Sequence, residues 1–166
     1  MSDLVVFYSL SGKSRLVAEW LAKALGADTA EIVEARPRDF EARGVFRCLF
    51  DSFLKRRPAI APMARKAQAY DRVILVCPVW AARIAGPART WLHGEGKNAK
   101  VLGLVLQSGA GKAYPHVLAE IEAAVGRKPD SLLTLSEADH GDKIAEGKVS
   151  AFAKTVVPKA AKFAKN

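Results

Sequence analysis

Residues 4–14, LVVFYSLSGKS, join an uninterrupted apolar run of strand length to a loop that holds three serines, one glycine and one lysine. A continuous apolar run, in contrast to an alternating one, is typical of a strand covered on both faces of its sheet. Residues 14–25 then carry apolar side chains at helical spacing, and Gly26 is well placed to end that helix. This order of a buried strand, a polar loop and an amphipathic helix indicates an α/β protein.

Later segments repeat the alternation of strand and helix. The other runs of strand length are residues 29–33, which alternate weakly, 73–77, 101–106 and 132–135. Helical spacing separates them and continues in the C-terminal tail, where Pro158 is expected to kink or interrupt the helix. Five strands and five helices in alternation predict a sheet of parallel strands joined by right-handed crossovers. Because no repeat or low-complexity linker divides the chain, we expect residues 1–166 to form one domain.

The composition is that of a globular protein without a membrane span. Of the 166 residues, 50% are hydrophobic and 26% are charged, which is enough apolar material for a core and too much for disorder. The longest segment without a charged residue, 101–111, is far shorter than the roughly 18 apolar residues that a transmembrane helix needs. No basic segment precedes the first apolar run, so no secretory signal is expected. Cys48 and Cys77 lie far apart, which predicts a reduced, cytoplasmic protein without disulfides or a cysteine-based metal site.

The net charge of +9 is concentrated in two segments of the chain. Residues 36–66 carry nine basic and three acidic side chains, and residues 143–166 carry six and one. Two interpretations stay open, a set of solvated faces or electrostatic attraction to an anionic partner. Nucleic acid is not favoured as that partner, because the sequence contains no recognition motif and no basic residues interleaved with exposed aromatic ones.

Residues 45–55 combine apolar and basic side chains and are predicted to form a helix. The side chains expected to pack inward are Phe46, Leu49, Phe50 and Phe53. The side chains expected to form a solvated basic face are Arg47, Lys55, Arg56 and Arg57.

Three loops follow the carboxyl ends of predicted strands, where open parallel sheets bind their ligands. The first, residues 9–14, places hydroxyls and Lys13 at a helix N-terminus, and Gly12 allows a ligand to approach the backbone closely. Unpaired amides and the helix dipole make such a loop suitable for a phosphate group. Serine N-capping beside a glycine turn would explain the same residues, and the spacing of a Walker loop is absent.

The second and third loops suit a flat, polar ring. In the second, residues 78–83, Trp80 stands at the mouth of the sheet, where it either stacks on a planar ligand or packs against its neighbours. Trp91, in the helix that follows, is expected in the core. The third loop, residues 107–112, contains two glycines whose backbone is free to donate hydrogen bonds to the edge of a ligand.

The histidines do not indicate a metal site, because His93, His116 and His140 lie far apart without the spacing of metal ligands. His140 stands among acidic residues and is expected in a solvated loop.

Taken together, the three loops resemble those of the flavodoxin-like proteins that bind FMN. SLSGKS at residues 9–14 is similar to that family's T/S-x-T-G-N-T phosphate loop. CPVWAARIAGPARTWL at residues 77–92 resembles its PVWAG segment, and SGAG at residues 108–111 falls at its third flavin loop. The resemblance spans almost the whole chain. It implies a three-layer sandwich in which helices cover both faces of a five-stranded parallel sheet in the order 2-1-3-4-5, with FMN as a noncovalent cofactor.

The resemblance also implies which residues contact the cofactor. Those that would hold the FMN phosphate are Ser9, Ser11, Gly12, Lys13 and Ser14. Those that would line the isoalloxazine are Pro78, Val79, Trp80 and Ala81, with Ser108, Gly109 and Gly111 at its other edge. No catalytic side chain is demanded, because the flavin carries the chemistry, although His116 could donate a proton at the flavin edge.

The implied function is flavin-dependent electron transfer, or NAD(P)H-dependent reduction of a small acceptor such as a quinone. The donor, the acceptor and any association into a homodimer are left open, and so is the classification as an enzyme. Lys13 replaces the family's usual Asn, and the pI of about 9.8 contrasts with the acidic flavodoxins. We therefore expect a flavin that is not tuned as a low-potential, one-electron carrier. The alternative is a binding module of the same fold that has lost its flavin and uses its basic surfaces to hold an anionic partner.

Overall fold

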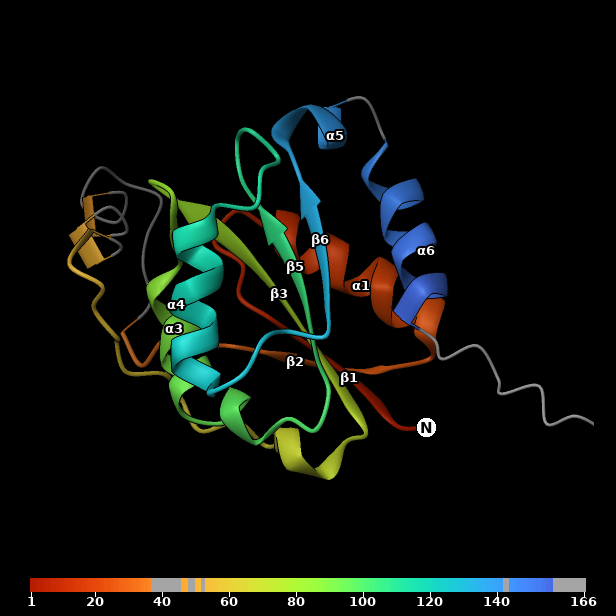
Figure 1. Cartoon of the computed structure of the whole chain (residues 1–166), viewed down its shortest axis with the longest axis horizontal. Helices are drawn as coiled ribbons and strands as arrows, with labels where there is room; N and C mark the ends of the chain where they lie inside the picture. Colours follow the sequence, from red (N-terminus) through yellow and green to blue (C-terminus); the bar gives the residue numbers. More distant parts are fainter. Residues whose placement is uncertain (37–45, 48–49, 52, 142–143, 157–166) are drawn as a thin grey trace, which may run out of the picture.

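The computed structural model describes residues 1–36, 46–47, 50–51, 53–141 and 144–156 (Figure 1). Its strands are β1 (Asp3–Phe7), β2 (Asp28–Glu31), β3 (Arg72–Trp80), β4 (Arg83–Ile84), β5 (Leu102–Gln107) and β6 (Ser131–Leu135). Its α-helices are α1 (Lys13–Leu25), α3 (Gly86–His93), α4 (Pro115–Val125), α5 (Glu137–Gly141) and α6 (Ala145–Val156). Two 3-10 helices cover Ala67–Ala69 and Gly96–Asn98.

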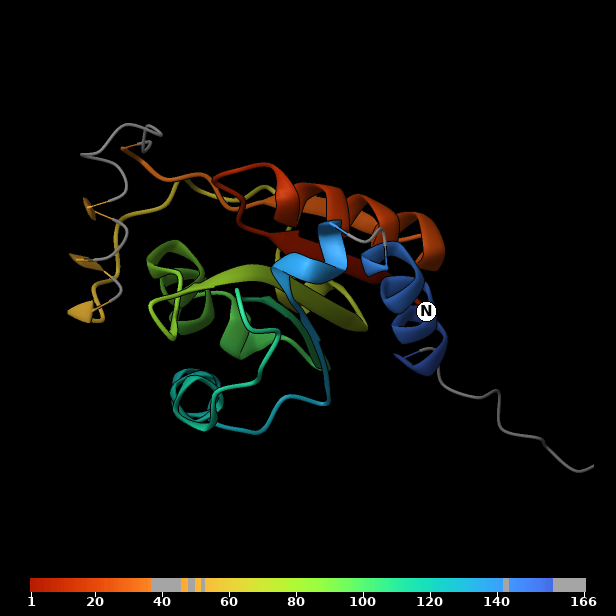
Figure 2. The ribbon, with the colours of Figure 1, turned by 90° about the horizontal axis from the view of Figure 1, so that it is seen from above.

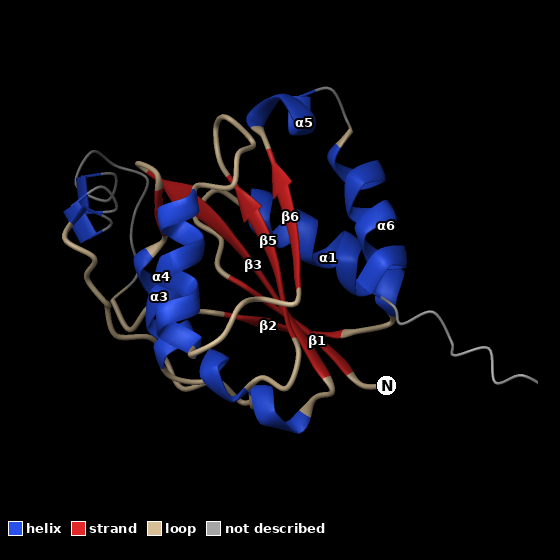
Figure 3. Cartoon of the chain, viewed as in Figure 1, coloured by secondary structure: helices blue, strands red, loops and turns tan. Residues whose placement is uncertain are grey.

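The central sheet contains the parallel strands in the order β2-β1-β3-β5-β6 (Figure 3). Numbered among themselves, these strands have the order 2-1-3-4-5, so the predicted sheet is confirmed. Strand order reverses beside β1, which is where doubly wound sheets bind their ligands. Phe7 pairs with Val76, and Pro78 pairs with Gln107, so the carboxyl ends of neighbouring strands meet at one edge of the sheet.

Helices cover both faces of the sheet, as predicted. Helices α1 and α6 pack on one face, and α3 and α4 pack on the other (Figure 2). In β1, Val5 and Phe7 belong to the first core, whereas Leu4 and Val6 belong to the second. Because both faces are buried, the positions from Leu4 to Phe7 are all apolar, which explains the uninterrupted runs in the sequence.

Strand β3 is longer than its apolar run predicts. Pro78, expected to begin a loop, continues the strand, and β4 then pairs with β3 in the antiparallel direction. Ala81 and Ala82 form the turn with φ angles of 47° and 54°, in the left-handed region that favours glycine. The extension is not visible in the sequence because proline ordinarily marks the end of a strand and alanine is rare at positive φ.

The inward packing predicted for the phenylalanines of residues 45–55 is wrong where the structure describes them. Phe46, Phe50 and Phe53 are 72%, 54% and 76% exposed, whereas Asp51 is buried. The inward position is polar because the buried Arg89 of α3 donates hydrogen bonds to the main-chain carbonyls of Asp51 and Arg56. Lys55, Arg56 and Arg57 are exposed, as expected, whereas Arg47 is only partly exposed because it pairs with the buried Glu34 and Asp51.

Other expectations are confirmed or fall outside the described residues. Trp91 is 1% exposed and lies in the core. Cys77 is a free, fully buried thiol, and burial raises its pKa to about 12. Cys48, Leu49 and the tail with Pro158 lie outside the described residues. Among the helices that are described, none is long and apolar enough to cross a membrane.

Candidate functional site

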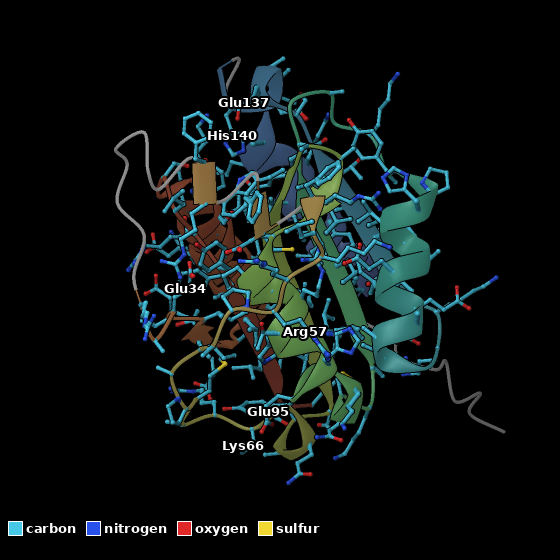
Figure 4. The ribbon with its side chains drawn as sticks, turned by 90° about the vertical axis from the view of Figure 1, so that its left-hand side faces the viewer. Glu34, Arg57, Lys66, Glu95, Glu137 and His140 are labelled. Carbon is cyan, nitrogen blue, oxygen red and sulfur yellow. The ribbon has the colours of Figure 1, made fainter. Side chains whose placement is uncertain are left out.

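A cavity of about 390 Å³ opens at the carboxyl edge of the sheet. Figure 4 shows Glu137 and His140 at this end of the molecule, with Lys66 and Glu95 at the opposite end. The predicted site residues that line the cavity are Ser11, Lys13, Ser14, Pro78, Val79, Trp80, Ala81, Ser108 and Gly109. The lining residues that were not predicted are Leu10, Gln107, Leu135, Ser136, Glu137 and His140.

Three predicted residues do not line the cavity, namely Ser9, Gly12 and Gly111. Gly12 shapes the loop, because it begins α1 with φ of 88°, and a Cβ there would meet nothing within 4 Å. Gly111 has φ of 61°, and a Cβ there would stand 2.8 Å from the Cβ of Ser136. Gly111 therefore lets the loop after β5 pack closely against the loop after β6.

The N-terminus of α1 is open toward a ligand. Its N-cap is Gly12, without a side-chain capping bond, so the alternative of a serine N-cap does not hold. No acidic side chain lies in the first turn of the helix. The unpaired amides and the positive end of the helix dipole are thus free to bind an anion.

Ser14 is held at this N-terminus by a chain of side chains from two other elements. Gln107 Nε2, at the end of β5, donates to Ser14 Oγ over 2.8 Å, and both residues are buried. His140 Nε2, in α5, lies 3.0 Å from Gln107 Oε1. Because Gln107 donates to Ser14, its own oxygen accepts from His140, and the Ser14 hydroxyl keeps its proton for another acceptor. His140 is therefore part of the cavity wall and not the solvated loop residue that was expected.

Two buried hydroxyls of the predicted site make no hydrogen bond within the described part of the chain, Ser9 Oγ and Ser108 Oγ. An unpaired buried polar atom costs about 1–3 kcal/mol. Ser108 lines the cavity, so a polar ligand atom there would satisfy its hydroxyl.

Trp80 forms the aromatic wall of the cavity and is itself supported from behind. The Tyr8 ring contacts it edge-on, with 5.7 Å between centroids and 78° between planes. Tyr8 Oη in turn donates a 2.7 Å hydrogen bond to the buried Glu34. This support fixes Trp80 at the mouth, where a planar ring can lie against it.

Lys13 and Glu137 form an exposed ion pair across the mouth of the cavity. Glu137 is the only carboxylate among the described residues that line the cavity. Asp139 does not line the cavity. Its carboxylate accepts hydrogen bonds from Lys148 and from the amide of Ser136, which lower its pKa. The loop after β6 thus contributes one negative charge opposite the one lysine of the first loop.

The structure assigns no role at this cavity to His116. Its Nε2 lies 2.5 Å from the carbonyl oxygen of Ala82, and the residue does not line the cavity. In the part of the chain that is described, no group of histidine, cysteine and carboxylate side chains could hold a metal ion.

Comparison with known proteins agrees with this geometry. The model of a family described as NADPH-dependent FMN reductase matches residues 4–120. No curated protein matches the chain.

Solved structures with a similar fold were also found. A flavoprotein from Lactobacillus acidophilus NCFM, crystallised in complex with FMN, is 19% identical with a TM-score of 0.67, over 86% of this chain and 97% of its own. The apo form of the flavoprotein from that organism is 21% identical with a TM-score of 0.62, over 83% of this chain and 95% of its own. An NAD(P)H:quinone oxidoreductase from Methanothermobacter marburgensis is 11% identical with a TM-score of 0.51, over 93% of this chain and 96% of its own. At such identities the structures establish a shared fold.

Proposed function

This chain belongs to the family of NADPH-dependent FMN reductases, and from that premise we propose that it holds FMN in the cavity at the carboxyl edge of the sheet. FMN is the cofactor of the family, and the reaction is an NAD(P)H-dependent reduction. The observation that carries the placement is the open N-terminus of α1, beside which Gln107 holds the hydroxyl of Ser14.

The residues around this N-terminus fit a phosphate monoester. The amides of the first loop and the Ser14 proton are donors directed at an acceptor-only group, and Lys13 adds a positive charge. The Gln107–His140 pair acts through Ser14 and is a positioning pair. A phosphate placed here satisfies donors that have no other partner within the described site.

The rest of the cavity fits a planar ring system. Trp80 offers an aromatic face, and Ser108 offers a buried hydroxyl without a partner among the described residues. The volume of about 390 Å³ lies in the range of cofactor sites. When bound, FMN accepts a hydride from NAD(P)H and passes electrons on. The protein's part is to bind and orient the ring at the mouth, where a small acceptor such as a quinone can reach it.

Further features of the proposal concern the whole chain. We propose a single domain of residues 1–166, because α1, α3, α4 and α6 all pack on one sheet. We also propose a cytoplasmic location, because the two cysteines lie far apart in the sequence and form no disulfide framework there.

The test is a titration of the flavin-free protein with FMN and, separately, with riboflavin, followed by tryptophan fluorescence. We expect FMN to quench the emission and to bind at least about tenfold more tightly than riboflavin, because a charge-assisted phosphate contact is worth about 1.5–3 kcal/mol. Trp80→Phe should reduce the quenching, whereas Trp91→Phe, in the core, serves as the matched control. Equal affinities for both flavins would contradict the phosphate placement. No quenching, and no NADPH oxidation when FMN and a quinone are supplied, would contradict the proposed function.

A further inference from the structure

The described residues of 46–57, apart from Arg47, present apolar and basic side chains outward and their one carboxylate inward. Phe46, Phe50 and Phe53 are more than half exposed, and Leu54 is 46% exposed. Asp51, which stands among them in sequence, is 6% exposed. The described part of this segment lies at the side of the molecule away from α6 in both Figure 1 and Figure 2.

The inward side of the segment is fixed by specific polar contacts. The Asp51 carboxylate lies 3.9 Å from Arg47 Nε and 4.0 Å from Arg56 Nη1. Arg47 also approaches the buried Glu34 at 3.5 Å, and Arg89 donates to the Arg56 carbonyl over 2.8 Å. A buried arginine and a buried carboxylate need these partners, so turning the phenylalanines inward would leave charges unpaired. The exposure of the phenylalanines is therefore a consequence of how the segment is anchored.

The outward side forms an aromatic-basic surface, defined by Phe46, Phe50, Phe53, Lys55, Arg56 and Arg57. Its aromatic residues have the spacing i, i+4 and i+7 and make a helical stripe, which Leu54 extends. The guanidinium of Arg56 lies 4.9 Å from the centre of the Phe50 ring. A shallow hollow of about 400 Å³ lies beside them, lined by Phe46, Arg47, Phe50, Asp51 and Arg56. Asp51 is the one carboxylate in residues 46–57; it lines this hollow but is only 6% exposed.

We propose that the aromatic-basic surface binds the surface of an anionic lipid bilayer. An apolar helical stripe bordered by lysine and arginine is the pattern of an interfacial segment, whose aromatic side chains enter the headgroup region while its cations contact lipid phosphates. The +9 net charge of the chain and the nine basic residues of 36–66 add long-range attraction to such a surface.

Other occupants suit the surface less well. A second copy of this chain, related by a two-fold axis, would gather two sets of Lys55, Arg56 and Arg57 in one interface, and no exposed carboxylate of the described residues 46–57 is there to balance their charge. Proteins that bind single-stranded nucleic acid stack successive bases on aromatic side chains along a basic groove. Here the aromatic side chains follow one another along a helix and continue into the aliphatic Leu54, which offers no ring for stacking. The proposal does not depend on the proposed function, because none of these residues lines the flavin cavity.

The test is flotation of the full-length protein with vesicles of phosphatidylcholine alone and with vesicles that also contain phosphatidylglycerol. We expect binding to the second kind only, weakened by salt. Phe50→Ser together with Phe53→Ser, and separately Lys55→Glu together with Arg57→Glu, should each weaken binding by more than about tenfold. Leu132→Ser with Ile144→Ser, and Lys97→Glu with Lys128→Glu, change exposed residues elsewhere and should leave binding within about twofold.

The same samples separate this proposal from its rivals and from the flavin site. Thermal unfolding and FMN titration of each variant report whether the fold and the cofactor site are intact, so a loss of FMN binding is scored independently of vesicle binding. Equal binding to both kinds of vesicle, or an equal loss in the control variants, would overturn the proposal. It would also be overturned by binding of a fluorescent oligo(U) in place of vesicles. A dimer in analytical ultracentrifugation that only the Phe50 and Phe53 variant abolishes, without vesicle binding, would assign the surface to a second copy.

Discussion

Ser14, Gln107 and His140 determine which proton the cavity offers to an anion. A serine hydroxyl can donate or accept, and an open helix N-terminus alone does not decide between the two. Gln107 Nε2 donates a hydrogen bond to Ser14 Oγ, and Gln107 Oε1 in turn accepts one from His140 Nε2. His140 can donate this hydrogen bond both as the neutral tautomer with its proton on Nε2 and as the imidazolium. The result is a hydroxyl committed to an acceptor-only ligand such as a phosphate.

The coupling between these residues predicts the outcome of a double-mutant cycle. Gln107→Leu and Ser14→Ala should each weaken FMN binding by about tenfold, on the scale of one lost hydrogen bond to a charged group, and should change riboflavin binding little. In the Ser14→Ala background, Gln107→Leu should have almost no further effect on the ratio of the two affinities. The measurement is the FMN and riboflavin dissociation constant of all four proteins. Additive losses would mean that Gln107 contacts the ligand by a route that does not involve Ser14.

Lys13 is shared between Glu137 and the ligand, and this predicts opposite effects of two substitutions. Lys13→Glu places a second negative charge beside the phosphate and should weaken FMN binding. Glu137→Gln frees Lys13 from its ion pair and should tighten FMN binding by a few-fold, since exposed pairs are worth about 0–1 kcal/mol. Both effects should shrink as salt is added to the titration. Unchanged affinity in both variants would mean that Lys13 points away from the ligand.

At the scale of elements, the cavity is built by loops whose packing depends on single backbone positions. Gly111 brings the loop after β5 against Ser136, at the start of the loop after β6. Gly126 ends α4 with φ of 79° and has nothing within 4 Å of its Cβ position. The two glycines share a left-handed conformation and differ in the space around them.

This difference predicts that Gly111→Ala destabilises the protein more than Gly126→Ala. Gly126→Ala should lower the free energy of unfolding by about 1–2 kcal/mol, the cost of the left-handed conformation for alanine. Gly111→Ala carries the same cost and in addition a 2.8 Å contact with the Cβ of Ser136, which requires one loop to move. Urea denaturation of both variants measures the difference, and FMN titration should show weaker binding only for Gly111→Ala. Equal losses of stability would mean that the loop after β5 yields without cost.

At the scale of the whole molecule, positive charge and the flavin cavity are combined in one chain. The one carboxylate among the described cavity residues, Glu137, is paired with Lys13. The whole chain has 26 basic and 17 acidic residues, which gives the net charge of +9. A reduced flavin is anionic, so its formation is favoured where the surrounding potential is neutral or positive.

The charge balance predicts the reduction potential of the bound cofactor. We expect the potential of fully reduced FMN in this protein to be less negative than in acidic flavodoxins. Lys13→Glu should shift it to more negative values, while Lys128→Glu, at an exposed position before the amino end of β6 and so away from the carboxyl edge, should leave it almost unchanged. A reductive titration against a reference dye measures each value. A couple as negative as that of acidic flavodoxins would contradict this account of the charge.

Much of the architecture and nine of the fifteen cavity-lining residues could be predicted before any tertiary information. The apolar runs of residues 4–8, 73–77 and 101–106 indicate buried parallel strands, because such strands are covered on both faces. The loops after them supply nine of the predicted residues that line the cavity. The fourth loop, after β6, lies at the same edge of the sheet and could have been included by the same rule, since Leu135 ends a predicted strand.

What the sequence by itself determined is therefore the main strands and helices, the parallel direction of the strands and the loops at the site, since periodicity and turn preferences are local properties of the chain. The order of the strands followed from the resemblance to the flavodoxin-like family. Only the tertiary structure decided that Ser14, Gln107 and His140 meet, because their contact depends on strand register and on the position of α5. It also decided that Phe46, Phe50 and Phe53 face outward. Helical spacing defines a stripe but not its direction, and here the buried Arg89 and Asp51 occupy the inner side and leave the aromatic residues at the surface.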